Sequence, residues 1–599
     1  MSEISPERTE EDLEHLRALE TLRRDGNPLA LYDLTQSLMA SGRTAPRIRY
    51  LQVLALAQMG DIERAAHLYE KYALGALVDD EDALALRGRI FKDRARTLSG
   101  AARALEFNRA FQAYRRAYRL YGGYFPGINA ASTAWAAGDT SNAQSLAQSV
   151  LGHEQLNPPR DFFSAASRAE ALVLLGQIAA AAETLERWLS DHDIGYGERA
   201  SAYRQLNWLC SLVEGDASEQ ARLLRALQPP PVLTFTGHMF RAGTEAETAL
   251  KGRIREAFDH LGSTIAYGAL ACGADILIAE EILRRNGEIH VVLPFVSEDF
   301  VEVSVRPGGE EWVGRYEACM AKAASVTLAT RMNFMHHDSQ FSYGAQLAMG
   351  LARLRAAQIS APSLQMAIWD GATSQSRAGA ALDVDHWRSL GQQTLVIDSG
   401  PVDRRLARPE HIEDQAGPKR VVRAIIFTDF EGYSRLPESE VPIFNREVMG
   451  RIAVVLNRHK DSVCSRNTWG DALYAVIAEP MEAAEIALEI TEALENVRLG
   501  GESAPQSGGM RIGLHFGPVY QEIDPVTGLD NFYGAEVTLT ARIEPKGAPG
   551  AIYATQAFAA MLAATWPDRF RTRYIGRVEL AKGYGEAPIY QVIRPSPRD

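Results

Sequence analysis

The chain has 599 residues, of which 46% are hydrophobic and 23% are charged. These proportions are ordinary for globular proteins, and the length allows about three or four domains that each bury a core. The formal net charge of −13 argues against a nucleic-acid-binding protein. Phosphate backbones repel an acidic chain that has no segregated basic patch.

Cysteine use and hydropathy indicate the compartment. The chain has 4 cysteines, widely spaced and without metal-ligand spacing, which suits a reducing cytoplasm. The first residues, MSEISPERTEEDLEHL, are acidic and polar and do not resemble a signal peptide. No uninterrupted apolar run reaches the length needed to cross a membrane. We therefore expect a cytoplasmic protein with neither a membrane nor a nucleic acid as its partner.

The first ~225 residues are rich in Ala, Leu, Arg and Glu and read as helix throughout. An apolar helical face ends at each of Gly60, Gly138 and Gly176, and an alanine follows five residues after each glycine. This echo resembles the tight turns and small-residue contacts of tetratricopeptide helix pairs. We predict an all-α helical-repeat domain over residues 1–227.

Three segments of this region carry a more specific resemblance: GRIFKD at 88–93, YRRAY at 114–118 and YFPGINAA at 124–131. Together they resemble the helical-repeat regulatory region of the apoptosis signal-regulating kinases, which is called the TRAF-binding region there. The resemblance covers residues ~50–190. It implies a scaffold that binds a protein partner or oligomerises, and a purely structural helical spacer is the alternative.

A different pattern begins after Gln228-Pro229-Pro230-Pro231, because a proline run stops a helix and stiffens a linker. Strands and helices then alternate, which predicts a Rossmann-like α/β domain with a parallel sheet over residues 228–400. The predicted strands are 232–236, 264–267, 290–294, 326–329, 365–368 and 394–397, and the predicted helices are 245–261 and 274–285.

The first two of these strands end in residues that suit a ligand site. Thr236-Gly237-His238 ends the first strand, at the edge where such sheets bind ligands. The loop GALACGAD at 268–275 leads from the second strand into a helix and resembles the SLOG superfamily, Rossmann-like domains that bind nucleotides or nucleotide-derived ligands. The resemblance implies a sensor with a nucleotide-derived ligand at Gly237, His238, Gly268, Gly273 and Asp275.

Two other interpretations of the middle domain stay open. The glycine-rich loop could be only a tight turn, since GxGxxG is absent. An enzyme acting on a nucleotide is a further alternative, although no nucleophile–base pair is evident. His336-His337-Asp338 is expected to be a surface loop rather than a metal site, because adjacent histidines generally point apart.

Residues 401–419 are polar, charged and proline-bearing and are predicted to be the linker to a last domain over 420–599. Residues 500–509 are predicted to be a flexible insertion. Within the last domain, the apolar run at 421–427 predicts a buried strand that ends near Asp429, and Asp471 is predicted at the turn of a hairpin. Two carboxylates at adjacent strand ends can hold two Mg²⁺ ions.

Four motifs follow one another here: FTDFEGYS at 427–434, TWGDAL at 468–473, RIGLHFG at 511–517 and VTLTAR at 537–542. In this order they resemble the class III nucleotidyl cyclases. The resemblance implies an α+β, ferredoxin-like catalytic domain that converts ATP or GTP to a 3′,5′-cyclic nucleotide and pyrophosphate. It also implies two Mg²⁺ or Mn²⁺ ions in each active site, held by Asp429 and Asp471.

The resemblance assigns further roles residue by residue. It implies that Arg542 neutralises charge at the α-phosphate and that Thr538, where the family usually has Asn, orients the ribose. Lys582 matches a triphosphate-binding lysine, with a solvated turn as the alternative. Asn467 and Asn531 stand at the purine-reading positions and favour ATP over GTP, although both could merely cap turns. The residues expected to face the phosphates are Phe430, Glu431, Gly432, Tyr433 and Ser434.

The family assembles its site across a homodimer, which we expect here as well. The alternative function is a catalytically weak, nucleotide-binding signalling scaffold. Thr538 and the two asparagines favour that alternative, whereas the presence of Asp429, Asp471 and Arg542 opposes it.

Overall fold

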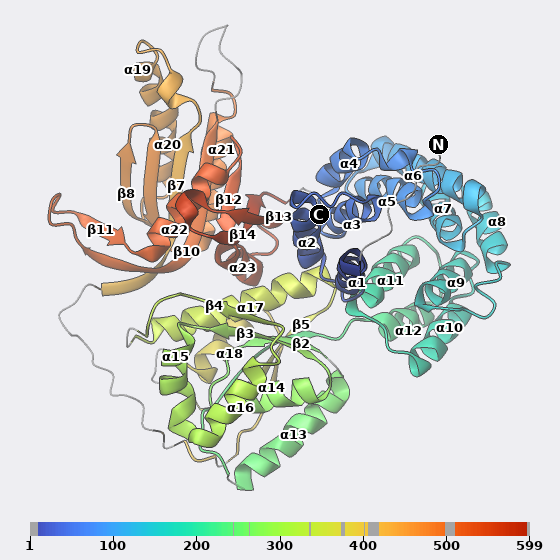
Figure 1. Cartoon of the computed structure of the whole chain (residues 1–599), viewed down its shortest axis with the longest axis horizontal. Coiled ribbons are helices and arrows are strands. Elements are labelled where there is room, and N and C mark those ends of the chain that lie inside the picture. The colour runs from blue at the N-terminus through green and yellow to red at the C-terminus, as the bar shows by residue number, and fades with distance from the viewer. Residues whose placement is uncertain are drawn as a thin grey trace. The chain divides into compact units, whose positions relative to one another are not determined.

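The computed structural model describes residues 10–243, 245–262, 264–334, 337–372, 378–400, 402–404, 406, 419–497 and 509–595. The chain divides into two compact units. The first comprises the N-terminal helices up to Pro229, and the second comprises residues 230–356 and 362–595. Figure 1 shows the elements of both. No helix among these described residues is long and apolar enough to cross a bilayer.

The first unit is built of paired α-helices, as predicted (Figure 1). Gly60, Gly138 and Gly176 have φ values of 77°, 92° and 75°, which favour glycine, and each lies in the turn after a helix. The helices are α1 Glu10–Arg24, α2 Pro28–Ala40, α3 Pro46–Gln58, α4 Ile62–Lys71, α5 Glu81–Arg96, α6 Gly100–Tyr121, α7 Tyr124–Ala136, α8 Thr140–Leu151, α9 Phe162–Leu174, α10 Ile178–Asp191, α11 Tyr196–Cys210 and α12 Ala217–Leu227.

The alanines of the repeat echo are the packing contacts that the pattern predicts. Ala65, Ala143 and Ala181 are fully buried, in the helix that follows each turn. Small side chains at these positions let neighbouring helices approach closely, which stabilises the stacked pairs. The repeat-type turns expected from the sequence are therefore confirmed.

The three motif segments of the first unit meet in its core. A Cβ at Gly88 would lie 2.6 Å from the ring of Tyr114, so α5 and α6 pack closely only with glycine there. The buried Lys92 ammonium donates to Asn129 Oδ1 at 2.9 Å and to Gln205 Oε1 at 3.0 Å. These motif residues therefore hold α5, α6, α7 and α11 together.

The second unit begins with the predicted parallel sheet, in the order β4-β3-β2-β1-β5-β6. All of its pairings are parallel. The strands are β1 Val232–Gly237, β2 Ile265–Gly268, β3 Glu288–Leu293, β4 Ser325–Leu328, β5 Ser363–Ile368 and β6 Thr394–Ile397. The helices are α13 Glu245–Leu261, α14 Ala274–Arg284, α15 Ser297–Phe300, α16 Glu310–Met320, α17 Ser339–Gln358 and α18 Ala380–Ser389.

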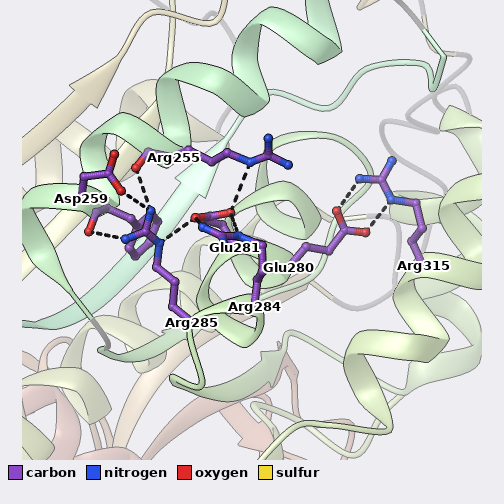
Figure 2. Close-up of polar contacts among 8 residues, drawn as sticks. Arg255, Asp259, Glu280, Glu281, Arg284, Arg285 and Arg315 are labelled. Atoms are coloured by element: carbon purple, nitrogen blue, oxygen red, sulfur yellow. Dashed lines mark hydrogen bonds and ion pairs between the residues drawn. The ribbon is translucent and has the colours of Figure 1, made fainter. Parts of the chain in front are cut away.

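Ion pairs fix α14, the helix that follows the glycine-rich loop, to its neighbours (Figure 2). The buried Glu281 pairs with Arg284 at 2.5 Å and with Arg285 at 2.7 Å, and Arg285 also reaches Asp259 of α13 at 2.6 Å. Arg315 of α16 forms an ion pair with Glu280 of α14 at 2.6 Å. The loop before α14 is thus held on a rigid support.

The rest of the second unit is a mixed sheet in the order β13-β14-β12-β10-β7-β9-β8, with β11 paired to β10. The strands are β7 Lys419–Phe430, β8 Val463–Trp469, β9 Ala472–Ile477, β10 Met510–Ile523, β11 Asp530–Tyr533, β12 Ile552–Thr555, β13 Arg571–Glu579 and β14 Glu586–Ile593. The helices are α19 Val441–Phe444, α20 Gly450–Arg458, α21 Pro480–Leu494, α22 Ala535–Ile543 and α23 Gln556–Thr565.

The mixed sheet contains two of the expected elements. The predicted strand at 421–427 lies within β7, and the predicted hairpin is the antiparallel pair β8–β9. The predicted insertion at 500–509 falls outside the described residues except for Gly509, and so does most of the predicted linker at 401–419.

Candidate active site

Asp429 and Asp471 lie at the ends of neighbouring strands. Asp429 is the second-last residue of β7, and Asp471 lies in the turn between β8 and β9, the strand that pairs with β7. The Phe430 amide donates to Asp471 Oδ2 at 3.2 Å. Burial, and next the negative charge of Asp429, raises the pKa of Asp471. The structure therefore brings together the two carboxylates that the sequence singles out.

Arg511 and Glu544 complete this cluster and were not predicted. Arg511 stands directly opposite Asp429 in the β10–β7 register, and its guanidinium forms an ion pair with Asp429. The same guanidinium lies 2.9 Å from Glu544 Oε1. Burial raises the pKa of Glu544 to about 7, against the opposing effect of Arg511. Arg511 belongs to a motif that the sequence analysis identified, but its partner Asp429 is 82 residues away. Only the register between β10 and β7, which the sequence analysis did not predict, shows that the two residues pair.

The loop after β7 turns sharply and continues into a single 3₁₀ turn, Tyr433–Arg435. Gly432 has a φ of 91°, which permits that turn. The Phe430 amide is paired with Asp471, and the Glu431 amide donates to the Gly509 carbonyl at 3.2 Å. These two amides are therefore already engaged, and the phosphate-binding role of the loop stays a prediction.

Thr538 and Arg542 lie on one helix, α22. The Thr538 hydroxyl donates to the Gly534 carbonyl at 3.3 Å, within the first turn of the helix. Lys582 is exposed in the turn between β13 and β14, with a φ of 60°. Among the described residues, no hydrogen bond or ion pair joins these side chains to Asp429 or Asp471.

Asn467 and Asn531 lie on the adjoining elements β8 and β11, which Ser465 connects by donating to the Asp530 carbonyl at 3.4 Å. The Asn467 side-chain oxygen accepts the Thr468 amide at 2.8 Å. The Asn531 side-chain nitrogen donates to Asp524 at 3.2 Å. These partners fix both amide orientations, because a backbone N–H can only donate and a carboxylate accepts.

The structure also brings together most of the second predicted site. Gly237, His238, Gly268 and Asp275 line one cavity of about 470 Å³ in the parallel-sheet domain. Gly273 precedes α14, with a φ of 97°.

The loop His336-His337-Asp338, which was expected to lie at the surface, lies partly in the wall of this cavity. Asp338 contributes to the cavity lining, which corrects the expectation of a plain surface loop. His337 Nδ1 lies 2.7 Å from the hydroxyl of Ser339, and His336 lies outside the described residues.

Asp429 and Asp471 are the candidate ligands for a divalent cation in this site. The described part of the chain contains no group of three or more His, Cys, Asp or Glu side chains that could hold a metal ion. Mg²⁺, however, is commonly bound through one or two carboxylates, with substrate phosphates and water completing its octahedron. Asp429 and Asp471, whose charges repel one another, therefore fit such an ion when a nucleotide supplies the remaining oxygens.

Two family models match the chain. The model "Tetratricopeptide Repeats-Sensor" matches residues 16–134, and the model "Adenylate and Guanylate cyclase catalytic domain" matches residues 419–594. The second match contains the Asp429, Asp471, Arg511 and Glu544 cluster. No curated protein matches the chain.

Among solved structures, the catalytic core of a rhodopsin-guanylyl cyclase with converted specificity, in complex with ATPαS, is 21% identical, with a TM-score of 0.26. It covers 30% of this chain and 99% of its own. The guanylate cyclase domain of RhGC from Catenaria anguillulae, in complex with GTP, is also 21% identical, with a TM-score of 0.26 and coverage of 29% and 98%.

The adenylyl cyclase CyaB from P. aeruginosa is 14% identical, with a TM-score of 0.26 and coverage of 30% and 97%. At these identities and TM-scores the likenesses say nothing of substrate or assembly for this chain. The family models are the informative matches: the chain joins a tetratricopeptide-repeat sensor domain at its N-terminus to a class III adenylate/guanylate cyclase catalytic domain at its C-terminus.

Proposed function

We propose that the protein is a nucleotidyl cyclase that forms a 3′,5′-cyclic nucleotide from a nucleoside triphosphate. The observation that carries this proposal is the convergence of Asp429 and Asp471 at neighbouring strand ends of the cyclase domain. In the reaction, the ribose 3′-oxygen bonds to the α-phosphorus and loses its proton. The bond from the α-phosphorus to the bridging oxygen breaks, and pyrophosphate leaves.

Different side chains of the cyclase domain have different roles in this reaction. Asp429 and Asp471 would hold two Mg²⁺ or Mn²⁺ ions, which when bound neutralise phosphate charge and acidify the 3′-hydroxyl. Arg511 holds the Asp429 carboxylate in place by pairing with it. Arg542 supplies positive charge to the α-phosphate, and Thr538 orients the ribose.

ATP is the proposed substrate, and the two asparagine amides support it. With its oxygen engaged by Thr468, Asn467 has its NH₂ group left to donate. With its nitrogen engaged by Asp524, Asn531 has its oxygen left to accept. One donor and one acceptor match the N1 acceptor and the amino donor of adenine, whereas the corresponding edge of guanine presents the reverse pattern.

We expect the purified full chain to convert ATP to cyclic AMP faster than GTP to cyclic GMP, with Mg²⁺ or Mn²⁺, as measured by chromatography of the products. Asn531→Leu keeps the side-chain size but removes the acceptor. It should lower kcat/KM for ATP about tenfold, the worth of one hydrogen bond.

Asn531→Asp, which retains oxygen acceptors but gives up the hydrogen bond to Asp524, is the control and should preserve the preference for ATP. A higher kcat/KM for GTP than for ATP in the unaltered chain would contradict the substrate assignment. Absence of any cyclic product would contradict the enzyme assignment as a whole.

A nucleotide-binding scaffold of little catalytic power is the second candidate function. The observation that favours it is the hydrogen bond from the Thr538 hydroxyl to the Gly534 carbonyl, which engages the group proposed to orient the ribose. Thr538→Asn, which restores the family's usual residue, separates the two candidates. A large gain in rate would show that Thr538 limits a working enzyme.

We also propose that the domains before residue 419 regulate the cyclase domain. A chain shortened to residues 418–599 should then differ from the full chain in cyclase rate per active site, measured at saturating ATP. Equal rates, with and without added nucleosides, would leave the front domains a role in protein binding or localisation only.

A further inference from the structure

The cavity in the parallel-sheet domain is built as a binding site. It opens at the carboxyl end of β1, which pairs with β2 on one side and β5 on the other. Such a switch point is where open parallel sheets bind ligands. Glycines keep the space beside the strands clear, since a Cβ at Gly237 would lie 2.3 Å from the Cβ of Ala274. The volume of about 470 Å³ suits a small molecule.

Two carboxyl groups in this lining have few partners. Asp275, only 8% exposed in the first turn of α14, accepts the Ala271 amide through Oδ2 at 3.2 Å. Its Oδ1 is buried and has no hydrogen-bond partner among the described residues. Asp383, in the first turn of α18, accepts the Thr236 hydroxyl at 2.8 Å.

The electrostatics of this pair favour a donor over an anion. Burial raises the pKa of both Asp275 and Asp383, to about 6 for Asp383, and the charge of Asp383 raises the pKa of Asp275 further. A ligand that donates hydrogen bonds would supply the partners that these groups lack. A phosphate would instead add a further acidic group to a cavity that Asp275, Asp383 and Asp338 already line.

The basic side chains of the cavity are already engaged. Arg404 is the one arginine or lysine among the described lining residues, and it donates to Asp370 Oδ2 at 2.5 Å. His238 lies 3.0 Å from Asp370 Oδ1, and burial lowers the pKa of His238, which favours its neutral form. The first turn of α14, where a nucleotide phosphate would be expected, holds the Asp275 carboxyl group instead.

Apolar side chains line much of the rest of the cavity and include the rings of Phe300, Phe334 and Phe341, beside polar residues such as Thr234, Ser304 and Asp338. Flat apolar walls with convergent polar groups suit a ring compound. We propose that this cavity binds a nucleoside: a ring body that carries hydroxyl and amino donors and has no phosphate. This narrows the nucleotide-derived ligand expected from the sequence to its unphosphorylated form.

Helix α17 connects this cavity to the cyclase domain. Its residues Gly344, Ala345, Ala348 and Met349 line the cavity. On a neighbouring face, the Tyr343 hydroxyl donates to the Phe516 carbonyl of β10 at 2.7 Å. β10 is also the strand that carries Arg511, the partner of Asp429.

A second contact brings α17 against α23. A Cβ at Gly350, one heptad after Tyr343, would lie 2.3 Å from the Ala560 carbonyl oxygen, so the two helices touch at their backbones. Arg353 adds a hydrogen bond to the Ala564 carbonyl at 2.9 Å. Nucleoside binding therefore alters the cyclase rate through α17, a step that rests on the proposed function.

Binding is tested first, by titration calorimetry on the full chain with adenosine and guanosine and with AMP and GMP. At least one nucleoside should bind, and its 5′-monophosphate at least about tenfold more weakly. Asp275→Asn should weaken nucleoside binding about tenfold or more. Asp385→Asn, which changes an exposed carboxylate on α18 of the same domain, should leave it unchanged.

Each contrary outcome overturns the binding proposal. These outcomes are equal or tighter binding of the monophosphate, no binding of either nucleoside to the folded chain, or unchanged affinity in Asp275→Asn. The last would place the nucleoside elsewhere, for example at the cyclase site. Asp383→Asn provides a second carboxyl variant if Asp275→Asn fails to fold.

The coupling is tested by the cyclase rate with and without the bound nucleoside, which should differ about fivefold or more. Tyr343→Phe should reduce that ratio while leaving the nucleoside affinity unchanged. Tyr316→Phe, a matched loss of a buried hydroxyl that bonds Ser297, should not reduce it. An unchanged ratio in Tyr343→Phe overturns the route through α17. A chain that binds nucleoside but makes no cyclic product refutes the proposed enzyme and leaves the binding site standing.

Discussion

Asp471→Asn should lower kcat for cyclic nucleotide formation by about a thousandfold or more. Losing one metal-binding carboxylate removes several kcal/mol of transition-state stabilisation, and each 1.36 kcal/mol is worth about a factor of ten. The asparagine oxygen can still accept the Phe430 amide, so the turn between β8 and β9 keeps its hydrogen bond. The loss would then be one of charge and not of shape.

The stability of this variant provides the check. The pKa of Asp471 is raised in the folded chain, so its charged form is disfavoured by folding. That penalty is present at neutral pH and disappears as the pH falls below the ordinary carboxyl pKa. A neutral asparagine avoids it, so without metal Asp471→Asn should unfold at the same temperature as the unaltered chain or a higher one.

Asp461→Asn, at an exposed position of the same domain, is the control and should retain full activity. Rates are to be compared at matched Mn²⁺ concentration. Unchanged turnover in Asp471→Asn would refute the role of this carboxylate as a metal ligand. A lower unfolding temperature would show that the variant is damaged structurally and would make its loss of activity uninformative.

The parts of the active site that could be predicted are those written in short motifs. Asp429 follows an apolar strand directly, and Asp471 sits in a tight turn, so local sequence determines the place of both. Their convergence follows from one pairing, β7 with β9. The pairing of Arg511 with Asp429 depends instead on the register of β10 against β7, which no local pattern specifies.

The lining of the cavity was even less predictable from local sequence patterns than the active site was. Gly237, His238 and Asp275 could be singled out because they end strands or open a helix. Asp383 and Arg404 reach the cavity from α18 and from the segment after β6, which the alternation of strands and helices does not distinguish.

Helix α17 was not predicted, for a physical reason. It lies between the cavity and the cyclase domain and has buried residues around most of its circumference, so its apolar residues do not form one stripe. Buried residues such as Tyr343, Ala348 and Met349 point in different directions around its axis. A helix that contacts two domains therefore lacks the amphipathic period by which surface helices are predicted.

The second large effect is expected when two inactive variants are combined. We propose a two-fold homodimer in which Asp429 and Asp471 of one protomer face Arg542, Asn467 and Asn531 of the other. Within one chain, no hydrogen bond or ion pair among the described residues joins Arg542 to either aspartate. Asp471→Asn and Arg542→Ala should each be nearly inactive alone.

Heterodimers of the two variants, isolated by two different affinity tags, should recover about half of the activity of the unaltered dimer. One of their two sites carries both substitutions, and the other carries neither.

The matched control is the heterodimer of Asp471→Asn with Asp429→Asn. Both substitutions fall on the same side of the interface there, so each site keeps one defect and the activity should stay at the level of the single variants. Recovery in the control as well would point to contamination or exchange. Isolated Asp471→Asn/Arg542→Ala heterodimers that stay inactive would show that the sites are not shared between protomers.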